Sequence, residues 1–361
     1  MAFQTHSVTH PAGTYPIHVG EGLRHQVGGL LAETHVARQA IVVSDSHVMP
    51  VYGEDVRRSL EEAGFAVHMV TLPAGEEHKT LDEVRTLYDA FLSAGIDRQT
   101  PVIALGGDVI GDTVGFAAAT ILRGVPFVQM PTTLLAMVDA SVGGKTGVDL
   151  PQGKNLVGAF KFPLMVIADT DTLATLPQEE IAAGLAETIK HGLIGDPGLL
   201  DILEQGDYTW PDLVSRSVHV KITVVEEDPF EKGRRAVLNL GHTFAHALEQ
   251  VSGYRLRHGF AVAIGMVAAA HLGVELEETC PALVRRLVRL LKQVGLPTRW
   301  SDVPELGPPP SAQRVRAAMQ TDKKRARGHL RFIIPADAGH VFMVARVPEE
   351  AVMAALDAIL V

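Results

Sequence analysis

Two histidines four residues apart, His242 and His246, lie in a segment with helical periodicity. Residues at this spacing share one face of a helix, so their imidazoles can bind the same divalent metal. His258 follows, and Glu187 lies on an earlier helical pattern. A catalytic zinc usually takes three ligands from His and carboxylate and keeps one position open. Spacing alone favours His242 and His246 as the pair. With 16 histidines in the chain, the alternative is that they are ordinary core or surface side chains.

A glycine-rich turn, residues 106–112, follows a strand-like run at 102–105 and precedes a helix-like stretch at 113–120. Glycines let the backbone approach a ligand closely, and a helix N-terminus offers free N–H groups to a pyrophosphate. The spacing is GGxxxG rather than the GxGxxG of the usual dinucleotide fingerprint. A bare strand-to-helix turn is the alternative interpretation.

Polar residues also follow other predicted strands in the same half. Ser44 and Asp45 end one strand, residues 75–79 follow another, and Thr132 and Thr133 follow a third. An acidic residue at a strand end can accept hydrogen bonds from a ribose. Together these clusters indicate one shared crevice.

The segment 141–147, SVGGKTG, has the composition of an anion-binding loop, and Lys154 and Asn155 follow it. It lacks the GxxxxGK[ST] spacing, which excludes an ordinary nucleoside triphosphatase loop. A Gly-Gly-Lys turn can still present N–H groups and an ammonium to a phosphate. The alternative is a solvent-facing loop.

The elements that must position these residues change type along the chain. Short runs rich in Val and Ile alternate with helical patterns at 51–63 and 81–94, which indicates a mostly parallel sheet. From about Leu176 helical periodicity dominates, so we place a domain boundary near Pro177. Prolines 308–310 predict a surface loop, and residues 322–327 form a basic run typical of a solvated surface. The strand-like runs are residues 40–43, 66–72, 102–105, 127–130 and 165–168.

Composition limits the class of protein. The formal net charge of −10 argues against broad binding to nucleic acid or to an anionic membrane. Cys280 is the one cysteine, which suggests a reducing compartment. The N-terminus lacks the pattern of a secretory signal, and the apolar stretch 260–272 is too short to span a membrane. We therefore expect a cytoplasmic protein.

Taken together, these motifs resemble the 3-dehydroquinate synthases, a family of sugar phosphate cyclases. The densest match is GGDVIGDTVGFAAATILRGVPFVQMPTTLLAMVDASVGGKTGVDLPQGKNLVGAF at 106–160. Further matches are GLAETIKHG at 184–192, NLGHTFAHALE at 239–249, HGFAVAIGM at 258–266 and the triplet at 322–324. The resemblance implies an α/β, Rossmann-like NAD-binding domain with a mostly parallel sheet at 1–176. It implies a mainly α-helical metal- and substrate-binding domain at 177–361.

The resemblance also implies site residues. The metal, zinc or possibly cobalt, would be held by Glu187, His242 and His258, with His246 as a substrate contact in the same site. NAD contacts would come from Asp45, Glu76, Lys79, Asp108, Val109, Ile110, Gly111, Asp112, Thr132, Thr133, Lys145, Lys154, Thr172, Leu173, Ala174 and Thr175. Substrate contacts and catalytic groups would be Asp139, Lys145, Asn155, Lys190, Lys221, Arg235, Asn239, His246 and one or both of Lys323 and Lys324. Arg123 resembles an arginine that reaches the neighbouring subunit's site, which implies a homodimer.

The implied activity is conversion of 3-deoxy-D-arabino-heptulosonate 7-phosphate to 3-dehydroquinate and phosphate, in the shikimate pathway to aromatic amino acids. It proceeds by transient oxidation with NAD, phosphate elimination, re-reduction and an intramolecular aldol closure. The chain departs from the family pattern at Asp108, where a third glycine is usual, and at Phe260, where an acid is usual. Three alternatives remain: a cyclase whose substrate lacks the carboxylate, a metal-dependent polyol or alcohol dehydrogenase, and a non-catalytic NAD- or zinc-binding module.

Overall fold

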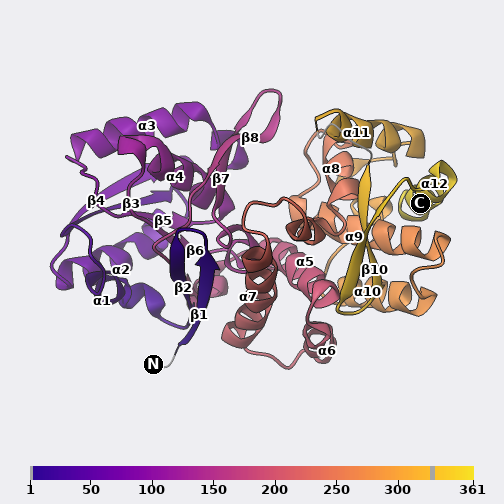
Figure 1. Cartoon of the computed structure of the whole chain (residues 1–361), viewed down its shortest axis with the longest axis horizontal. Coiled ribbons are helices and arrows are strands. Elements are labelled where there is room, and N and C mark those ends of the chain that lie inside the picture. Colours follow the sequence, from indigo (N-terminus) through magenta and orange to yellow (C-terminus); the bar gives the residue numbers. More distant parts are fainter. Residues whose placement is uncertain (1–2, 326–329) are drawn as a thin grey trace. The chain divides into compact units, whose positions relative to one another are not determined.

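A seven-stranded sheet forms the centre of the first part of the chain (Figure 1). The computed structural model describes residues 3–325 and 330–361, with side chains at 3–320 and 330–361. The strand order is β1-β2-β9-β6-β5-β3-β4; β1 runs antiparallel to β2, and all other neighbours are parallel. The strands are β1 (Gln4–His10), β2 (Gly13–Gly20), β3 (Gln39–Asp45), β4 (Ala66–Leu72), β5 (Val102–Gly106), β6 (Phe127–Pro131) and β9 (Met165–Asp169).

The predicted fold class is confirmed, since all five predicted strands lie within β3, β4, β5, β6 and β9. Strands β3, β5, β6 and β9 are buried almost throughout, which explains why each reads as a continuous apolar run. The first two strands were not predicted. Strand β1 is largely exposed and polar at the antiparallel edge, so its sequence lacks such a run.

Helices cover both faces of this sheet (Figure 1). Successive side chains of a strand point to opposite faces. Accordingly, Ile41 and Val43 pack in one apolar cluster with α3 (Leu81–Ser93) and α4 (Asp108–Thr120). Ala40 and Val42 pack in the other, with α1 (Val27–Ala32) and α2 (Met49–Glu62). Polar loops follow the carboxyl ends of the parallel strands.

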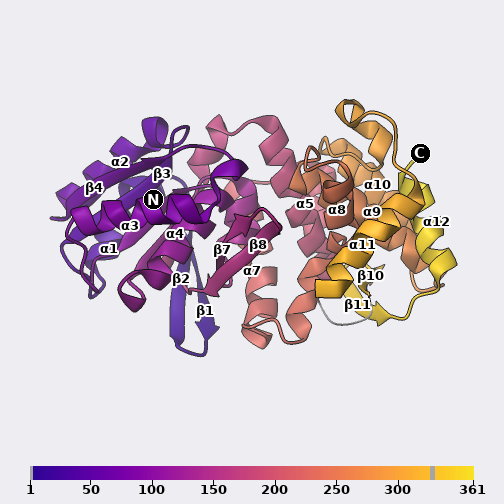
Figure 2. The ribbon, with the colours of Figure 1, turned by 90° about the horizontal axis from the view of Figure 1, so that it is seen from above.

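A separate two-stranded hairpin, β7 (Lys145–Leu150) and β8 (Gly153–Phe160), packs beside α4 (Figure 2). Its first strand contains residues 145–147 of the segment 141–147, which the sequence analysis identified as a possible anion-binding loop. Short helical turns complete this part of the chain: η1 (Leu23–His25), η2 (Glu76–His78), η3 (Ile121–Arg123), the π-helix η4 (Ala136–Ala140) and η5 (Thr170–Thr175).

The chain forms two compact units, the first of residues 1–176 and 210–230 and the second of residues 177–209 and 231–361. Helix α7 (Trp210–Glu227) therefore packs with the first unit, on η4, β1 and β2. The second unit contains α5 (Gln178–Ile194), α6 (Pro197–Gln205), η6 (Arg234–Asn239), α8 (His242–Val251), α9 (His258–Glu275), α10 (Pro281–Gln293), η7 (Trp300–Asp302), η8 (Pro304–Leu306), α11 (Ala312–Arg325), β10 (Arg331–Asp337), β11 (His340–Ala345) and α12 (Glu349–Ile359).

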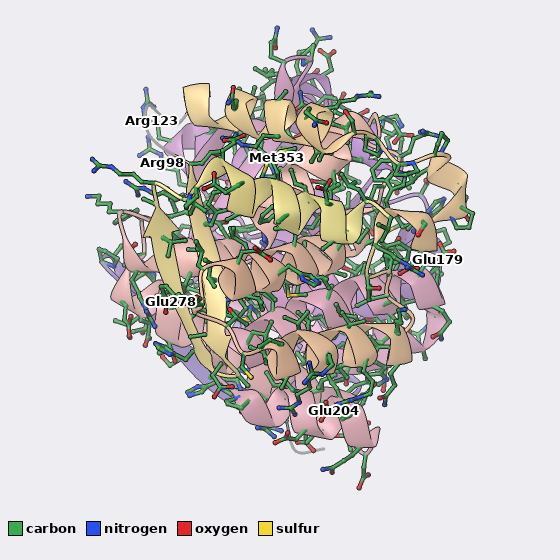
Figure 3. All side chains as sticks on the ribbon, turned by 90° about the vertical axis from the view of Figure 1, so that its right-hand side faces the viewer. Arg98, Arg123, Glu179, Glu204, Glu278 and Met353 are labelled. Atoms are coloured by element: carbon green, nitrogen blue, oxygen red, sulfur yellow. The ribbon has the colours of Figure 1, made fainter. Side chains whose placement is uncertain are left out.

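Helices α5 and α9 are the core of the second unit. Figure 3 draws the side chains of the described residues and labels, from this unit, Met353 on α12 and Glu204 on α6 among others. In the described residues α9 alone is long and apolar enough to cross a membrane, and 72% of that stretch is buried inside the protein. It is therefore a core helix of this unit. The two helices approach closely, because a Cβ added at Gly259 would lie 2.4 Å from Cα of Ala183.

Candidate functional site

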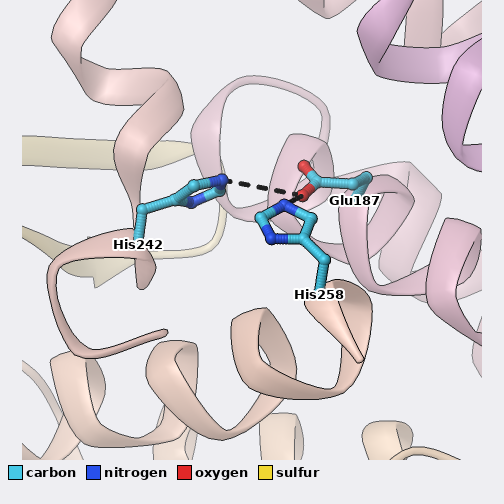
Figure 4. A group of neighbouring side chains, drawn as sticks. All are labelled: Glu187, His242 and His258. Carbon is cyan, nitrogen blue, oxygen red and sulfur yellow. Dashed lines mark ion pairs between the residues drawn. The ribbon is translucent and has the colours of Figure 1, made fainter. Parts of the chain in front are cut away.

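Three helices of the second unit bring Glu187, His242 and His258 together (Figure 4). Glu187 lies in α5, His242 is the first residue of α8, and His258 is the first residue of α9. The Nε2 atoms of both imidazoles lie 3.8 Å from Oε1 of Glu187. One ligand atom from each residue lies within 4.8 Å of the other two, a spacing that one cation can span.

The local backbone explains why α8 begins at His242. Gly241, its N-cap, has φ +80°, in the left-handed region that glycine adopts without strain. A Cβ at Gly241 would also lie 2.7 Å from the backbone nitrogen of Met266. Glycine is therefore needed both for the turn into α8 and for the contact of α8 with α9.

The imidazole of His242 is in the form that binds a metal. Burial lowers the pKa of His242 well below 6.5, and the positive charge of Lys190 and the neighbouring His258 and His246 lower it further. The ring is therefore neutral at neutral pH. The Nδ1 atom of His242 lies 3.2 Å from the carbonyl oxygen of Leu240. A carbonyl oxygen can only accept a hydrogen bond, so Nδ1 carries the proton. This leaves the lone pair of Nε2 directed toward Glu187.

The carboxylate of Glu187 also fits a metal ligand. It is 1% exposed, and neither oxygen has a hydrogen-bond donor of good geometry among the described residues. Lys190 Nζ forms an ion pair with Oε2, so the charge is partly balanced. A buried carboxylate without hydrogen bonds is costly unless a cation satisfies it. One carboxylate with two imidazoles is a donor set that suits zinc and similar divalent ions.

His246, which the spacing favoured as a ligand, lies beside this group rather than in it. Its ring centroid is 5.6 Å from that of His242 and 6.5 Å from that of His258. Glu187, His242 and His258 form a set of possible ligand atoms that does not include His246. The second histidine of α8 thus borders the three residues that the family resemblance implied.

Two carboxylates that contact predicted site residues, His258 and Asn239, were missed by the sequence analysis. Glu249 Oε1 lies 3.3 Å from Nδ1 of His258. Glu231 Oε1 accepts a hydrogen bond of 3.3 Å from Asn239 Nδ2, and Glu231 has a positive φ of 55°. The spacing of Glu249, seven residues after His242, was an available signal, because such residues share a helix face. Glu231 lies in a loop and carries no comparable signal.

Arg235 and Lys190 are the buried cations of this unit that the sequence singled out. Arg235 is 2% exposed and lies in η6, which leads through Leu240 and Gly241 into α8. Lys190 is 1% exposed, one turn after Glu187 on α5. Fully buried cations are rare unless they are paired or bind a ligand. The backbone of Lys323 and Lys324 belongs to α11, but their side chains lie outside the described residues.

In the first unit, the predicted NAD contacts lie along one edge of the sheet. Asp45 ends β3, residues 76–79 follow β4, and residues 108–112 follow β5. Thr132 and Thr133 follow β6, and η5 follows β9. Because these five strands are parallel, their carboxyl ends meet at the same edge. This edge is where open α/β sheets bind their ligands.

Lys79 and Asp112 form a buried ion pair at this edge, with 2.6 Å between Nζ and Oδ2. Burial raises the pKa of Asp112 to about 6, and this effect outweighs the attraction of Lys79, which lowers the pKa. The nearby carboxylates of Asp108 and Glu76 raise the pKa further by repelling the charged form. Burial acts to lower the pKa of Lys79, yet Asp112, Asp108 and Glu76 more than compensate, and the net shift is upward. The ammonium of Lys79 thus interacts electrostatically with three carboxylates.

The β7–β8 hairpin is tied to the same edge. Lys154 Nζ lies 3.0 Å from Glu76 Oε1, and the backbone N–H of Asp149 donates to the carbonyl of Lys79 at 2.8 Å. Asn155 has a positive φ of 53°, and its N–H donates to Asp149 Oδ1 at 2.7 Å. These bonds hold the predicted residues Lys154 and Asn155 at the sheet edge.

The remaining predicted residues of this unit occupy distinct positions. Asp139, in the π-helix η4, pairs with Lys221 of α7 at 2.7 Å. Lys145 begins β7 and is exposed. Arg123 is exposed and lies in a strained turn, since Leu122 and Arg123, neither of them a glycine, both have positive φ. π-helical turns and strained residues are frequent at functional sites.

Comparison with known proteins adds an independent line of evidence. Two family profiles match, described as 3-dehydroquinate synthase N-terminal at residues 69–183 and 3-dehydroquinate synthase C-terminal at residues 184–325. The 3-dehydroquinate synthase of Symbiobacterium thermophilum is 46% identical, over 96% of this chain and 98% of that protein.

Solved structures of related cyclases share the fold. A 2-epi-5-epi-valiolone synthase from Streptomyces hygroscopicus subsp. jinggangensis, with NAD⁺ and Zn²⁺ bound, is 27% identical with a TM-score of 0.83, covering 96% of both chains. A 2-deoxy-scyllo-inosose synthase complexed with carbaglucose-6-phosphate, NAD⁺ and Co²⁺ is 26% identical with a TM-score of 0.86, covering 98% of this chain and 99% of the other.

Proposed function

This chain belongs to the 3-dehydroquinate synthase family, and we propose that it converts 3-deoxy-D-arabino-heptulosonate 7-phosphate to 3-dehydroquinate and phosphate. It is a carbon–oxygen lyase of the shikimate pathway, which uses NAD and one divalent metal. The observation that carries this function is the group of Glu187, His242 and His258, in which the carboxylate is buried and the imidazoles are partly exposed, within a chain that matches the family over nearly its whole length.

Glu187 and the Nε2 atoms of His242 and His258 hold the divalent metal. When bound, the metal polarises substrate hydroxyls as a Lewis acid, and NAD takes up and returns a hydride. Lys190, paired with Glu187, limits the net negative charge of the ligand set and offers an ammonium to the substrate. His246, beside His242, is placed to relay a proton through its imidazole.

Residues along the sheet edge hold NAD. The N–H groups at the start of α4 face the pyrophosphate, which the helix dipole also favours. Asp45 accepts from a ribose hydroxyl, as an acidic residue at a strand end does in dinucleotide-binding sheets. We assign NAD binding to domain 1–176 and the metal, with most of the substrate contacts, to domain 177–361.

The substrate is an anion with a carboxylate and a phosphate, whereas the protein carries a net charge of −10. Its recognition therefore requires local cations. Arg235 suits the carboxylate, since a guanidinium binds two oxygens in one plane. Lys145, Lys221 and one or both of Lys323 and Lys324 supply further positive charge, and Asp139, Asn155 and Asn239 bind hydroxyls.

We assign a homodimeric state in which Arg123 serves the neighbouring subunit's site. Its support is the strained turn that presents an exposed arginine. Mixing an Arg123→Ala subunit with a subunit inactivated at His242 should restore part of the activity; absence of any restoration would remove Arg123 from this role. We place the enzyme in the cytoplasm, because its one cysteine, Cys280, is exposed and suits a reducing compartment.

A phosphate-release assay tests the function. With the heptulosonate phosphate, we expect phosphate and 3-dehydroquinate in equal amounts, dependence on NAD, and no net NADH. A chelator should abolish turnover, and Zn²⁺ or Co²⁺ should restore it. Accumulation of NADH with glycerol or simple alcohols, or preferential turnover of a heptulose phosphate without the carboxylate, would contradict the proposal.

A further inference from the structure

The two ring nitrogens of His258 face different carboxylates. Nε2 lies 3.8 Å from Oε1 of Glu187, on the side of the metal ligands. Nδ1 lies 3.3 Å from Oε1 of Glu249, whose side chain is 6% exposed. An ionised carboxylate has no proton to donate, so beside an imidazole it accepts a hydrogen bond from the ring nitrogen that carries the proton. Nδ1–H of His258 therefore points to Glu249, and the lone pair of Nε2 is left for a metal.

Helix α8 places this carboxylate by its periodicity. His242, His246 and Glu249 follow at intervals of four and three residues, so they lie on one face of the helix. The same helix thus provides one metal ligand at its first residue and, two turns later, the group that contacts the second imidazole. His258 itself comes from the first turn of α9.

The loop between the two helices fixes both partners. Ser252 Oγ donates to the carbonyl of Glu249 at 2.7 Å, and the N–H of Leu256 donates to Ser252 Oγ at 3.2 Å. The N–H of Tyr254 donates to the carbonyl of Glu249 at 2.8 Å. Glu249 and the residues that lead into α9 are therefore held by the same hydrogen-bonded turn, which limits how far the carboxylate and the imidazole can separate.

The two imidazoles of the site are held by different kinds of acceptor. His242 Nδ1 faces a neutral backbone carbonyl, that of Leu240, whereas His258 Nδ1 faces a charged carboxylate. A charged acceptor strengthens the hydrogen bond and makes the opposite nitrogen a better donor to a metal. It also lowers the net charge of the metal-loaded site by one.

We propose that Glu249 is a positioning residue that fixes the tautomer and orientation of His258 and tightens metal binding through its charge. The inference rests on the proposed metal site of Glu187, His242 and His258. It predicts that the affinity for metal depends on a residue that touches neither the metal nor the substrate.

The test uses the full-length protein and three variants, Glu249→Gln, Glu249→Asp and Glu249→Leu. Affinity for Zn²⁺ and Co²⁺ is measured by chelator competition, and the visible spectrum of the Co²⁺-loaded protein reports the ligand geometry. We expect Glu249→Gln to weaken metal binding about 10- to 100-fold, in the range found for partners of metal-bound histidines. Glu249→Leu should weaken it further, because it removes the acceptor as well as the charge, and Glu249→Asp should recover part of the loss.

Glu275→Gln is the matched control. Glu275 is exposed on α9 and acts electrostatically on His271, which is not one of the ligands. Its removal should leave metal affinity and the Co²⁺ spectrum unchanged. The thermal stability of the metal-free Glu249→Gln protein should remain close to that of the unmodified protein.

The outcomes separate the inference from the function on which it rests. Glu249→Gln and Glu249→Leu proteins with unchanged metal affinity and Co²⁺ spectrum would overturn the role of Glu249 alone. Weakened metal binding matched by an equal loss of stability in the metal-free protein would show a structural role and also overturn it. If His258→Ala leaves metal affinity intact, the metal site itself is wrong, and the proposed function fails with it.

Discussion

Lys79 and Asp112 form a buried ion pair in which the carboxylate keeps a pKa of about 6 although an ammonium lies 2.6 Å away. The folded protein thus binds a proton at Asp112 more readily than the unfolded chain, whose carboxyl titrates near 3.8. The stability contributed by this group is present at low pH and is lost as the pH rises through about 6. At neutral pH the charged form of Asp112 reduces the free energy of unfolding. A residue kept in spite of such a loss is more often functional than structural.

Replacing Lys79 with Met should therefore have a pH-dependent effect. At pH 8 the change leaves Asp112 charged and buried, and breaking a buried pair costs about 3–5 kcal/mol. At pH 5.5 Asp112 can take up a proton, so the loss in the free energy of unfolding should be smaller. Urea denaturation at both pH values measures it.

A double variant provides the internal control for this pair. Lys79→Met with Asp112→Asn should recover part of the stability lost in Lys79→Met at pH 8, because no buried charge is then left unpaired. Arg57→Met, which breaks exposed ion pairs with Glu54 and Glu61 on α2, should cost far less. Equal losses from Lys79→Met at the two pH values would contradict the coupling.

The buried guanidinium of Arg235 should determine substrate affinity. Arg235→Ala removes charged hydrogen bonds worth about 1.5–3 kcal/mol, so KM should rise roughly 10- to 100-fold. Arg235→Lys should recover the charge but not the two-oxygen geometry, and so restore only part of the affinity. Steady-state kinetics with the heptulosonate phosphate measure both. The exposed neighbour Arg234→Ala is the control, and an unchanged KM in Arg235→Ala would remove Arg235 from the carboxylate site.

The close approach of α5 and α9 at Gly259 should be intolerant of a methyl group. Gly259→Ala would place Cβ 2.4 Å from Cα of Ala183, so the helices must move apart. We expect a loss of about 1–3 kcal/mol in unfolding free energy, as in other overpacked cores, with weaker metal binding because His258 is adjacent. In contrast, Gly29→Ala on α1 has open space and should stabilise the protein by about 0.5–1 kcal/mol. A Gly259→Ala protein as stable as the original would show that the contact can relax.

Acidification should destabilise the first unit through His6. Burial and the nearby His219 lower the pKa of His6 below 6.5. The unfolded chain therefore binds more protons than the folded protein at mildly acidic pH. This contribution to stability is fully present above pH 6.5 and is lost as the pH falls through the lowered pKa.

Thermal melts of the metal-loaded protein between pH 8 and 5 should test this contribution. The Tm of His6→Gln should fall less steeply with acidification than that of the original protein, since it lacks the half-buried histidine that takes up a proton on unfolding. The exposed His35→Gln should follow the original protein. If His6→Gln and His35→Gln gave the same slope, the buried environment of His6 would not contribute.

Local patterns predicted the parallel sheet well, because buried strands such as β5 and β9 concentrate Val, Ile and Ala in short runs. They did not predict β1 or the β7–β8 hairpin. Strand β8 is largely exposed, and its residues Lys154 and Asn155 read as a loop. Exposed strands are specified by their partners rather than by a run of their own.

The candidate metal ligands could not be chosen from sequence spacing alone. Periodicity correctly placed His242 and His246 on one helix, but it could not say which turn of α8 faces Glu187. That choice depends on two close contacts, Gly241 with α9 and Gly259 with α5, which bring the first residues of α8 and α9 next to α5. Only the family resemblance supplied the set of Glu187, His242 and His258, which the structure brings together.

The position of α7 in the sequence affects how the first unit folds during synthesis on the ribosome. The first unit has its sheet by residue 176, yet α7, which covers η4, β1 and β2, is synthesised more than thirty residues later. Until then Asp139 lacks the ammonium of Lys221, and Gln4 and His6 lack their partners Asp212 and Ser215. A polypeptide stopped at Leu176 should therefore be less stable than the complete first unit. Because each unit consists of two separate stretches of sequence, neither is one uninterrupted fragment.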